Sequence, residues 1–464
     1  MPEPVVNPAI FKAYDIRGLY GDEIDAGTAR AIGRAFARVI AAREDKPTSQ
    51  LRLGLGRDMR LTAPELGQAY GAGITDEGAD LLDAGRVGTE MLYYLVGSQE
   101  LDGGLMCTAS HNPKAYTGAK LVGRGALALS GDTGIGDVRD RIADGLGDAP
   151  GGGSTQEVSV YEGFQRAALQ FIDASAIKPL KVVVDGGNGM AGPMVGPLLE
   201  RLGLDLITAY WTPNGEFPDH GPNPLLPENR EFIMAEVIRQ EADLGIAWDG
   251  DADRCFFIDE TGSFVDGDFL TALLAEAMIA KYRTPPTVPT VLYDVRASRA
   301  VADTARAAGG SALVNRVGHA FFKARMRAEN AVFGGEVSGH YYFRDFYCAD
   351  SGTLPALLIL EMLSRREARM SELLEPYRSQ YFISGEINSE VADPPARLEQ
   401  LAQRYADGRQ DRLDGISIDY DDWHFNVRSS NTEPLVRLCL ESLRSPEDMV
   451  QRRDEVLSVI RAAG

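Results

Sequence analysis

Residues 242–262 have the sequence ADLGIAWDGDADRCFFIDETG, in which a short acidic stretch separates two apolar runs. Runs of this length, rich in aromatic and β-branched residues and bounded by polar loops, are typical of buried β-strands. The stretch therefore predicts a strand, an acidic loop and a second strand, an arrangement expected in an α/β sheet.

The acidic loop, DGDADR (249–254), places Asp249, Asp251 and Asp253 at alternate positions. Three neighbouring carboxylates repel one another unless a cation lies among them, and oxygen ligands suit Mg²⁺. A calcium-binding EF-hand is excluded because Arg254 stands where the sharp turn needs glycine. A solvated acidic turn, and a phosphatase with Asp249 as its nucleophile, remain open at this point.

Alternating strand-like and helix-like stretches extend outward from this loop in both directions. Strands are expected at 51–58, 181–185 and 291–295, and helices at 62–80 and 352–366. The last 90 or so residues have the pattern of antiparallel strands followed by a helix. We therefore expect three related α/β domains around a central cleft and a C-terminal α+β domain, with boundaries at 1–153, 154–257, 258–370 and 371–464.

The composition limits the classes of molecule that the protein is expected to bind. The chain has 464 residues and a net charge of -21, so nucleic acid and anionic membranes are not expected to bind it. It shows neither a secretory signal nor an apolar run long enough to span a bilayer. Its four cysteines form no CxxC pair, which favours a reducing cytoplasm over a disulfide framework.

A second loop, CTASHNPKAYTGAK (107–120), contains Ser110 directly before His111. Serine, asparagine and proline are common in turns and caps, so this pattern alone does not mark a nucleophile. A magnesium ion held by three carboxylates, however, keeps coordination positions open, and a phosphate oxygen usually fills one. Ser110 is therefore a candidate carrier of such a phosphate.

Two further polar loops complete the candidate site. GGEVSGH (334–340) holds Glu336, Ser338 and His340, which suit adjacent sugar hydroxyls if strand-like alternation points them the same way. RSSNTEP (428–434) offers the Arg428 guanidinium and several turn amides, which suit a phosphate. A polar hairpin and an ordinary asparagine turn are the alternatives for these two loops.

Taken together, these motifs resemble the α-D-phosphohexomutase superfamily of phosphomannomutases and phosphoglucomutases. FKAYDIRG (11–18), TASHNP (108–113), DGDADR, GEVSGH and RSSNTEP resemble its substrate, phosphoserine, metal, sugar-specificity and phosphate-binding loops, in that order along nearly the whole chain. The resemblance implies the four-domain fold expected above.

The resemblance also implies roles. Ser110 is expected to carry the phosphate and, with the three aspartates of the acidic loop, to bind Mg²⁺. The other residues expected to act in catalysis are His111, Lys120, Arg17 and His319, and those expected to bind substrate are Tyr14, Arg254, Glu336, Ser338, His340, Arg428, Ser430, Asn431 and Thr432. Lys120, Arg254 and His111 would supply positive charge to the transferring phosphoryl group.

The expected reaction moves a phosphoryl group between O6 and O1 of a hexose phosphate through hexose 1,6-bisphosphate, which also serves as activator. GEVSGH is similar to the GEMSGH of mannose-type or dual-specificity relatives, so phosphomannomutase is expected and phosphoglucomutase is the alternative. An aspartyl phosphatase and a non-catalytic sugar-phosphate binder are kept as rivals. The protein is expected to be a cytoplasmic monomer or homodimer.

One position departs from the resemblance. In LYDVRASR (292–299), Arg296 stands where relatives are expected to have lysine. Because arginine does not act as a general base in proteins, Arg296 is not counted among the catalytic residues.

Overall fold

The computed structural model describes residues 6–429 and 435–462. Its contacts divide the chain into two compact units. The first comprises residues 1–265, 323–328 and 339–370, and the second residues 266–322, 329–338 and 371–464. Among the described residues, none of the helices combines the length and the apolar character that a membrane crossing requires.

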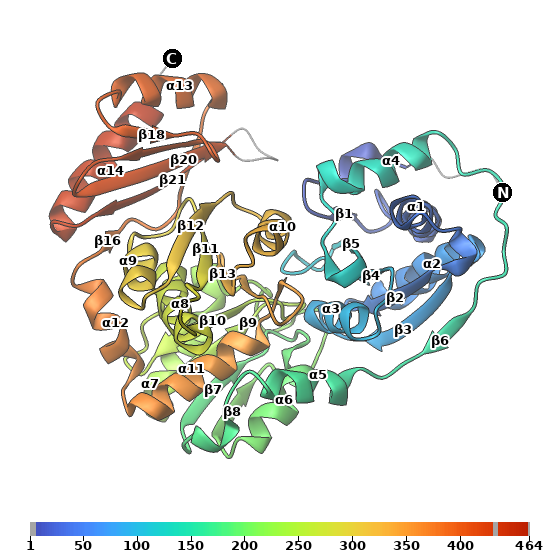
Figure 1. The fold of residues 1–464 in the computed structure, drawn as a ribbon, viewed down its shortest axis with the longest axis horizontal. Coiled ribbons are helices and arrows are strands. Elements are labelled where there is room, and N and C mark those ends of the chain that lie inside the picture. Colours follow the sequence, from blue (N-terminus) through green and yellow to red (C-terminus); the bar gives the residue numbers. More distant parts are fainter. Residues whose placement is uncertain (1–5, 430–434, 463–464) are drawn as a thin grey trace. The chain divides into compact units, whose positions relative to one another are not determined.

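The N-terminal part is a mixed sheet (Figure 1) with the strand order β1 (Ile16–Leu19), β5 (Tyr116–Gly123), β4 (Gly103–Cys107), β2 (Arg52–Arg57), β3 (Asp80–Arg86) and β6 (Thr155–Glu157). Strands β4, β2, β3 and β6 run parallel, and β5 is antiparallel to both β4 and β1. The stretch GDAPGGGSTQEV (147–158), rich in glycine and serine as linkers are, therefore ends in a strand, because β6 pairs with the edge of β3.

Side chains of successive strand residues point to opposite faces of this sheet, and helices pack against both faces. Leu53 and Leu55 share a core with α1 (Ala26–Glu44), α2 (Ala63–Asp76) and α4 (Ile135–Ala143). Gly54 and Gly56 face Leu92 of α3 (Thr89–Ser98), which packs on the other side. The glycines leave room for the helix to approach the strand closely.

A second sheet has the order β10 (Cys255–Asp259), β9 (Leu244–Trp248), β7 (Lys181–Asp185) and β8 (Asp205–Ala209), and only β10 is antiparallel to its neighbour. Its helices are α5 (Tyr161–Leu169), α6 (Ala191–Arg201) and α7 (Glu231–Gln240). The strand, acidic loop and strand predicted from residues 242–262 are confirmed as β9, the loop 249–254 and β10.

The third region contains the parallel strands β12 (Ser311–Asn315), β11 (Thr290–Asp294) and β13 (Phe333–Gly335), and separately the antiparallel pair β14 (Tyr341–Phe343) and β15 (Ala349–Asp350). Its helices are α8 (Gly267–Tyr282), α9 (Ala300–Ala307), α10 (His319–Glu329), α11 (Thr353–Arg366) and α12 (Met370–Arg378). Helix α11 confirms the helix predicted over 352–366.

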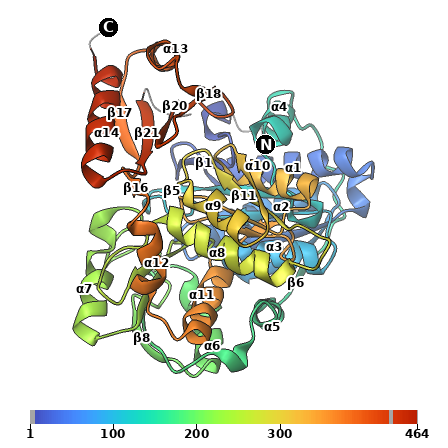
Figure 2. The same cartoon turned by 60° about the vertical axis from the view of Figure 1, so that its left-hand side comes forward.

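The C-terminal sheet is antiparallel and consists of β16 (Phe382–Ile383), β17 (Ile387–Glu390), β18 (Arg409–Asp411), β19 (Ile416–Asp419), β20 (Trp423–Ser429) and β21 (Leu435–Ser442). Helices α13 (Pro394–Arg404) and α14 (Pro446–Ile460) share one apolar core with alternate residues of β19, β20 and β21, so both lie on the same face of the sheet (Figure 2). The expected fold class, three α/β regions followed by an α+β domain, is confirmed.

Candidate active site

The loop that carries Ser110 joins β4 to β5, and Ser110 follows the carboxyl end of β4 by three residues. Ser110 has a left-handed backbone conformation, with φ of 48°, which non-glycine residues adopt at a cost. Its backbone N–H donates to Thr108 Oγ1 at 2.8 Å, and its side chain is buried. Loops at the carboxyl ends of parallel strands are the usual binding sites of α/β sheets.

The acidic loop likewise follows the carboxyl end of a strand, β9. The glycine-rich turn after β7 packs against this loop. Met190 N–H donates to Gly250 O at 2.9 Å. A Cβ on Gly189 would lie 2.6 Å from the same oxygen, so the turn can approach the loop this closely only with glycine. The run GGNG in the sequence thus fixes the backbone between Asp249 and Asp251.

The serine loop and the acidic loop meet at Asp249. Ser110 Oγ donates to Asp249 Oδ2 at 3.1 Å, and Arg254 Nε and Nη2 donate to the same oxygen at 2.9 and 2.7 Å. Asp249 has no exposed surface and Arg254 almost none. The candidate phosphate carrier is therefore placed beside a carboxylate that a guanidinium already neutralises.

Lys120, on β5, binds the other two aspartates of the loop. Its Nζ donates to Asp251 Oδ2 at 2.7 Å and also ion-pairs with Asp253. Burial alone would raise the pKa of Asp251, but the Lys120 ammonium brings it well below the usual range. Asp253 keeps a pKa well above the usual range because of burial and the nearby Asp251 carboxylate.

These three carboxylates suit a divalent cation. Asp249, Asp251 and Asp253 each present an oxygen within 4.8 Å of the others. Among the described residues, Asp251 Oδ1 and Asp253 Oδ1 are buried and have no hydrogen-bond partner. Buried oxygens without donors, together with the Asp253 carboxyl whose pKa is raised by burial and by the neighbouring Asp251 carboxylate, fit the predicted Mg²⁺ site.

His111 and Arg17 border the serine loop. His111 Nδ1 lies 3.4 Å from Ser110 Oγ, and burial, reinforced by Arg254 and Arg17, places the pKa of His111 well below 6.5. A neutral imidazole accepts a proton but supplies no positive charge, whereas burial beside aspartates leaves the pKa values of Lys120 and Arg254 raised, so these two side chains are cationic. Arg17 Nη1 donates to Thr108 O at 2.7 Å, while Tyr14 is half-buried just before β1.

The GEVSGH loop differs from its expected shape. Residues 337 and 338 form a turn after β13 rather than an extended strand, so the argument that alternation aligns Glu336, Ser338 and His340 was wrong. Glu336 is buried and its Oε2 accepts a hydrogen bond from Gly318 N–H at 2.8 Å, directly before His319 at the start of α10.

Arg296 and Arg428 share one carboxylate in the second compact unit. Arg296 Nη1 and Arg428 Nη2 donate to Glu386 Oε2 at 3.1 and 3.3 Å, and Arg296 also binds Asp294 through two nitrogens. Arg428 is the second-last residue of β20 and is buried. Ser430, Asn431 and Thr432 lie outside the described residues.

Sequence reasoning missed Thr89 and Glu90, which begin helix α3. Thr89 Oγ1 donates to Asp251 Oδ2 at 2.5 Å, so α3 orients the acidic loop. Glu90 is completely buried, and its carboxyl accepts hydrogen bonds from Ser351 and Thr353. Burial raises the pKa of Glu90 to about 8. The position of α3 directly after the end of β3 was the available clue.

A buried lysine also escaped notice. Lys323 Nζ lies 2.6 Å from Asp350 Oδ1 and 3.7 Å from the centre of the Tyr93 ring, and neither charged side chain is accessible to solvent. Asp350 forms a second acidic group with Asp253 and His340. Because the Lys323 ammonium already neutralises Asp350, this group is better explained as a buried ion-pair network than as a second metal site.

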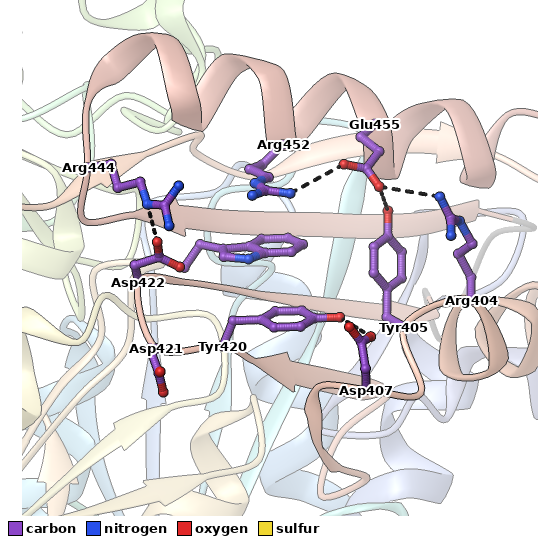
Figure 3. A pocket seen from close by; sticks show the side chains of 10 residues that line it. Arg404, Tyr405, Asp407, Tyr420, Asp421, Asp422, Arg444, Arg452 and Glu455 are labelled. Carbon is purple, nitrogen blue, oxygen red and sulfur yellow. Dashed lines mark hydrogen bonds and ion pairs between the residues drawn. The ribbon is translucent and has the colours of Figure 1, made fainter.

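The C-terminal domain has a hollow of about 480 Å³ (Figure 3), lined by Arg404, Tyr405, Asp407, Tyr420, Asp421, Asp422, Trp423, Arg444, Arg452 and Glu455. Its charged groups largely satisfy one another, as Glu455 does for Arg404 and Arg452. None of the site residues predicted from the sequence lines it, so the hollow is not the candidate active site.

Comparison with known proteins identifies the class to which this fold and these loops belong. Models of the family "Phosphoglucomutase/phosphomannomutase" match in order: alpha/beta/alpha domains I, II and III over residues 8–144, 162–262 and 266–381, and the C-terminal domain over 386–459. The chain belongs to the phosphoglucomutase/phosphomannomutase family, as its resemblance to the phosphohexomutases predicted.

Particular relatives are similar over nearly their whole length. A phosphomannomutase of Salmonella montevideo is 42% identical, covering 98% of this chain and all of the relative. Proteins named phosphohexose mutases from Xanthomonas campestris are also 42% identical, over 97% of this chain and 99% of the relative. A family member from Burkholderia thailandensis, of known crystal structure, superimposes with a TM-score of 0.88 at 32% identity, covering 99% of each chain.

Proposed function

We propose that this chain is a phosphomannomutase that interconverts mannose 6-phosphate and mannose 1-phosphate through a phosphorylated Ser110. The observation that carries the proposal is the 3.1 Å contact between Ser110 Oγ and Asp249 Oδ2, within a buried cluster of three aspartates, Lys120 and Arg254. A serine hydroxyl transfers phosphate only where positive charge stabilises the transferring group. Relatives named phosphomannomutase, at 42% identity, support the choice of sugar.

Two phosphoryl transfers make up the reaction. In the first, the free hydroxyl of the hexose monophosphate attacks the phosphorus on Ser110, a new P–O bond forms, the P–Oγ bond breaks, and a nearby base takes the hydroxyl proton. The product of this step is hexose 1,6-bisphosphate. It reorients within the site and then returns its other phosphoryl group to Ser110 Oγ. The same bisphosphate, supplied from outside, phosphorylates the resting enzyme and so acts as activator.

Asp249, Asp251 and Asp253, with the phosphate on Ser110, would hold Mg²⁺. When bound, the cation neutralises the carboxylates and the charge of the phosphoryl group. Lys120 donates a hydrogen bond to Asp251 of the acidic loop and would be within reach of a phosphoryl oxygen on Ser110. Arg254 orients Asp249 through its two hydrogen bonds and offsets part of the rise that burial causes in the pKa of Asp249.

The remaining candidate residues have two kinds of role. Those that would transfer protons or supply charge at the reacting hydroxyl are His111, Arg17, His319 and Tyr14. Glu336, Ser338 and His340 would bind sugar hydroxyls in either orientation of the substrate, and the non-reacting phosphate would be bound by Arg428, Ser430, Asn431 and Thr432.

An aspartyl phosphatase is the main rival, and the surroundings of Asp249 argue against it. Asp249 has no exposed surface, and Oδ2, the oxygen nearest Ser110, already accepts two hydrogen bonds from Arg254. A carboxylate so engaged is poorly placed to attack phosphorus, whereas Ser110 Oγ donates a single hydrogen bond to Asp249 Oδ2 and lies 3.4 Å from His111 Nδ1.

The test is to incubate the protein with Mg²⁺ and glucose 1,6-bisphosphate labelled with ³²P, and to map the labelled peptide in the wild type and in Ser110→Ala. We expect label on Ser110 and none in the variant. Label on Asp249 would assign the phosphatase, and no label with intact sugar-phosphate binding would assign the non-catalytic binder.

A second candidate, phosphoglucomutase or dual-specificity activity, is favoured by the Xanthomonas relatives named phosphohexose mutases, which match equally well. Comparing kcat/KM for mannose 1-phosphate and glucose 1-phosphate decides between them: a ratio near one indicates dual use. The proposal includes a cytoplasmic location and a monomer or homodimer, which cell fractionation and sedimentation would test.

A further inference from the structure

Arg60 lies in the turn between β2 and α2 and is almost completely buried, with 2% of its surface exposed. Its guanidinium donates hydrogen bonds to four backbone carbonyls of the serine loop: Nη1 to Pro113 O at 3.0 Å and Tyr116 O at 3.1 Å, and Nη2 to Ser110 O at 2.8 Å and Asn112 O at 2.6 Å. One side chain thus binds the loop along its whole length.

Asp58 fixes Arg60 and the start of the same loop. Asp58 Oδ2 lies 3.3 Å from Arg60 Nε and accepts a hydrogen bond from Thr108 Oγ1 at 2.7 Å. Thr108 Oγ1 in turn accepts the backbone N–H of Ser110. A continuous chain of contacts therefore runs from a buried carboxylate to both sides of the Ser110 peptide.

Ser110 is the strained point of the serine loop, because its backbone is held in the left-handed region. The loop's own backbone supplies a donor to Pro113 O, and Arg60 adds donors to Ser110 O, Asn112 O and Tyr116 O. Arginine suits this task because its planar fork offers five N–H donors in fixed directions, whereas a lysine ammonium offers three on a flexible stem. The face of Arg60 also lies over the Phe217 ring, 5.4 Å from its centre.

We infer that Arg60 is a positioning residue that aims Ser110 at the acidic loop for phosphoryl transfer, without touching the substrate itself. This inference rests on the proposed phosphoserine function. If Arg60 is lost, the loop relaxes, phospho-Ser110 loses its alignment with the substrate hydroxyl, and water reaches the phosphorus while Lys120 and Arg254 still lie near it. Hydrolysis then breaks the P–Oγ bond, returns a proton to Oγ and releases inorganic phosphate, so more bisphosphate activator is needed.

The test compares Arg60→Met and Arg60→Lys with a matched control, Arg34→Met. Arg34 is another poorly exposed arginine of the same sheet region, which binds the Glu77 carboxylate and two backbone carbonyls far along the chain from the serine loop. Each protein is phosphorylated with ³²P-labelled glucose 1,6-bisphosphate. Loss of label without sugar is then measured, together with kcat and KM for mannose 1-phosphate at saturating bisphosphate.

For Arg60→Met we expect label to be lost about tenfold faster and kcat to fall about 100-fold, with KM within about threefold of wild type, because a displacement near 1 Å at a reacting atom costs about that much. Arg60→Lys should show a smaller change in the same direction. Arg34→Met should lose stability but keep the wild-type lifetime of the label.

Wild-type label lifetime and kcat in Arg60→Lys and in a folded Arg60→Met would overturn the inference, as would equal losses in Arg34→Met. If Arg60→Met does not fold, Arg60→Lys alone decides. Failure of the proposed function gives a different result, since the wild type itself would then carry no label on Ser110.

Discussion

Glu90 gives a sharp prediction about pH and stability. Its carboxyl is completely buried, and burial raises its pKa from 4.5 to about 8 despite hydrogen bonds from Ser351 and Thr353. Folding therefore takes up a proton between these two pH values. The stability tied to this group is fully present below pH 4.5 and is lost as the pH rises through about 8. A difference of about 3.5 pH units corresponds to at most about 5 kcal/mol.

The substitution Glu90→Gln isolates the pH-dependent contribution of Glu90 to the free energy of unfolding. Glutamine is neutral at every pH and has nearly the shape of the protonated acid. We would measure urea unfolding of wild type and variant between about pH 5.5 and pH 9. The stability of the wild type relative to Glu90→Gln should fall across this range. The effects of other titrating groups cancel in the difference, unless they interact with Glu90.

Asp80→Asn is the matched control. Hydrogen bonds from the Ser154 side chain and backbone lower the pKa of Asp80, so its contribution changes only in acid and stays constant over the tested range. A wild-type minus Glu90→Gln difference that is equally flat would refute the reasoning, since it would mean that Glu90 is ionised in the folded chain.

Three other outcomes follow from the structure. Lys323→Met should cost about 3–5 kcal/mol of folding free energy by removing the buried ammonium that neutralises Asp350, and Asp350→Asn added to it should restore most of the loss in the same urea assay. Gly88→Ala should weaken Mg²⁺ binding, measured by calorimetry, because its Cβ would lie 2.3 Å from Met194 Sδ and 2.7 Å from Asp251 O; unchanged affinity would contradict this. Chelation of divalent cations should abolish mutase activity, and added Mg²⁺ should restore it; activity that survives chelation would argue against the assigned metal loop.

The sequence predicted those parts of the fold that depend on local pattern. The apolar runs around the acidic loop could only be buried strands, and β9 and β10 confirm this. The GEVSGH loop was misjudged because alternation was assumed where Gly339, with φ of 88°, belongs to a turn. The end of the glycine-rich stretch at 147–158 forms β6, which the local sequence does not indicate, because its partner β3 lies about 70 residues earlier.

The candidate site also contains residues that local motifs predict and residues that they do not. Ser110 and the three aspartates stand in short motifs and could be named from the sequence. Arg60 and Thr89 could not, since their roles arise only when separate parts of the chain come together. The sole hint for both was their position just after strands β2 and β3, at the edge of the sheet where β4 delivers the serine loop.

The beginning of α3 also has a consequence for how this protein is made. Thr89 meets Asp251, 162 residues later in the chain, and Glu90 meets Ser351, 261 residues later. At about 5–20 residues per second, a ribosome needs about 8–32 s to supply the first partner and about 13–52 s to supply the second. Until then Glu90 has no donor and stays hydrated and ionised, so α3 cannot settle on its sheet as it does in the finished protein. The start of α3, and with it the hydrogen bond from Thr89 that orients the acidic loop, is thus completed only after about three-quarters of the chain has been synthesised.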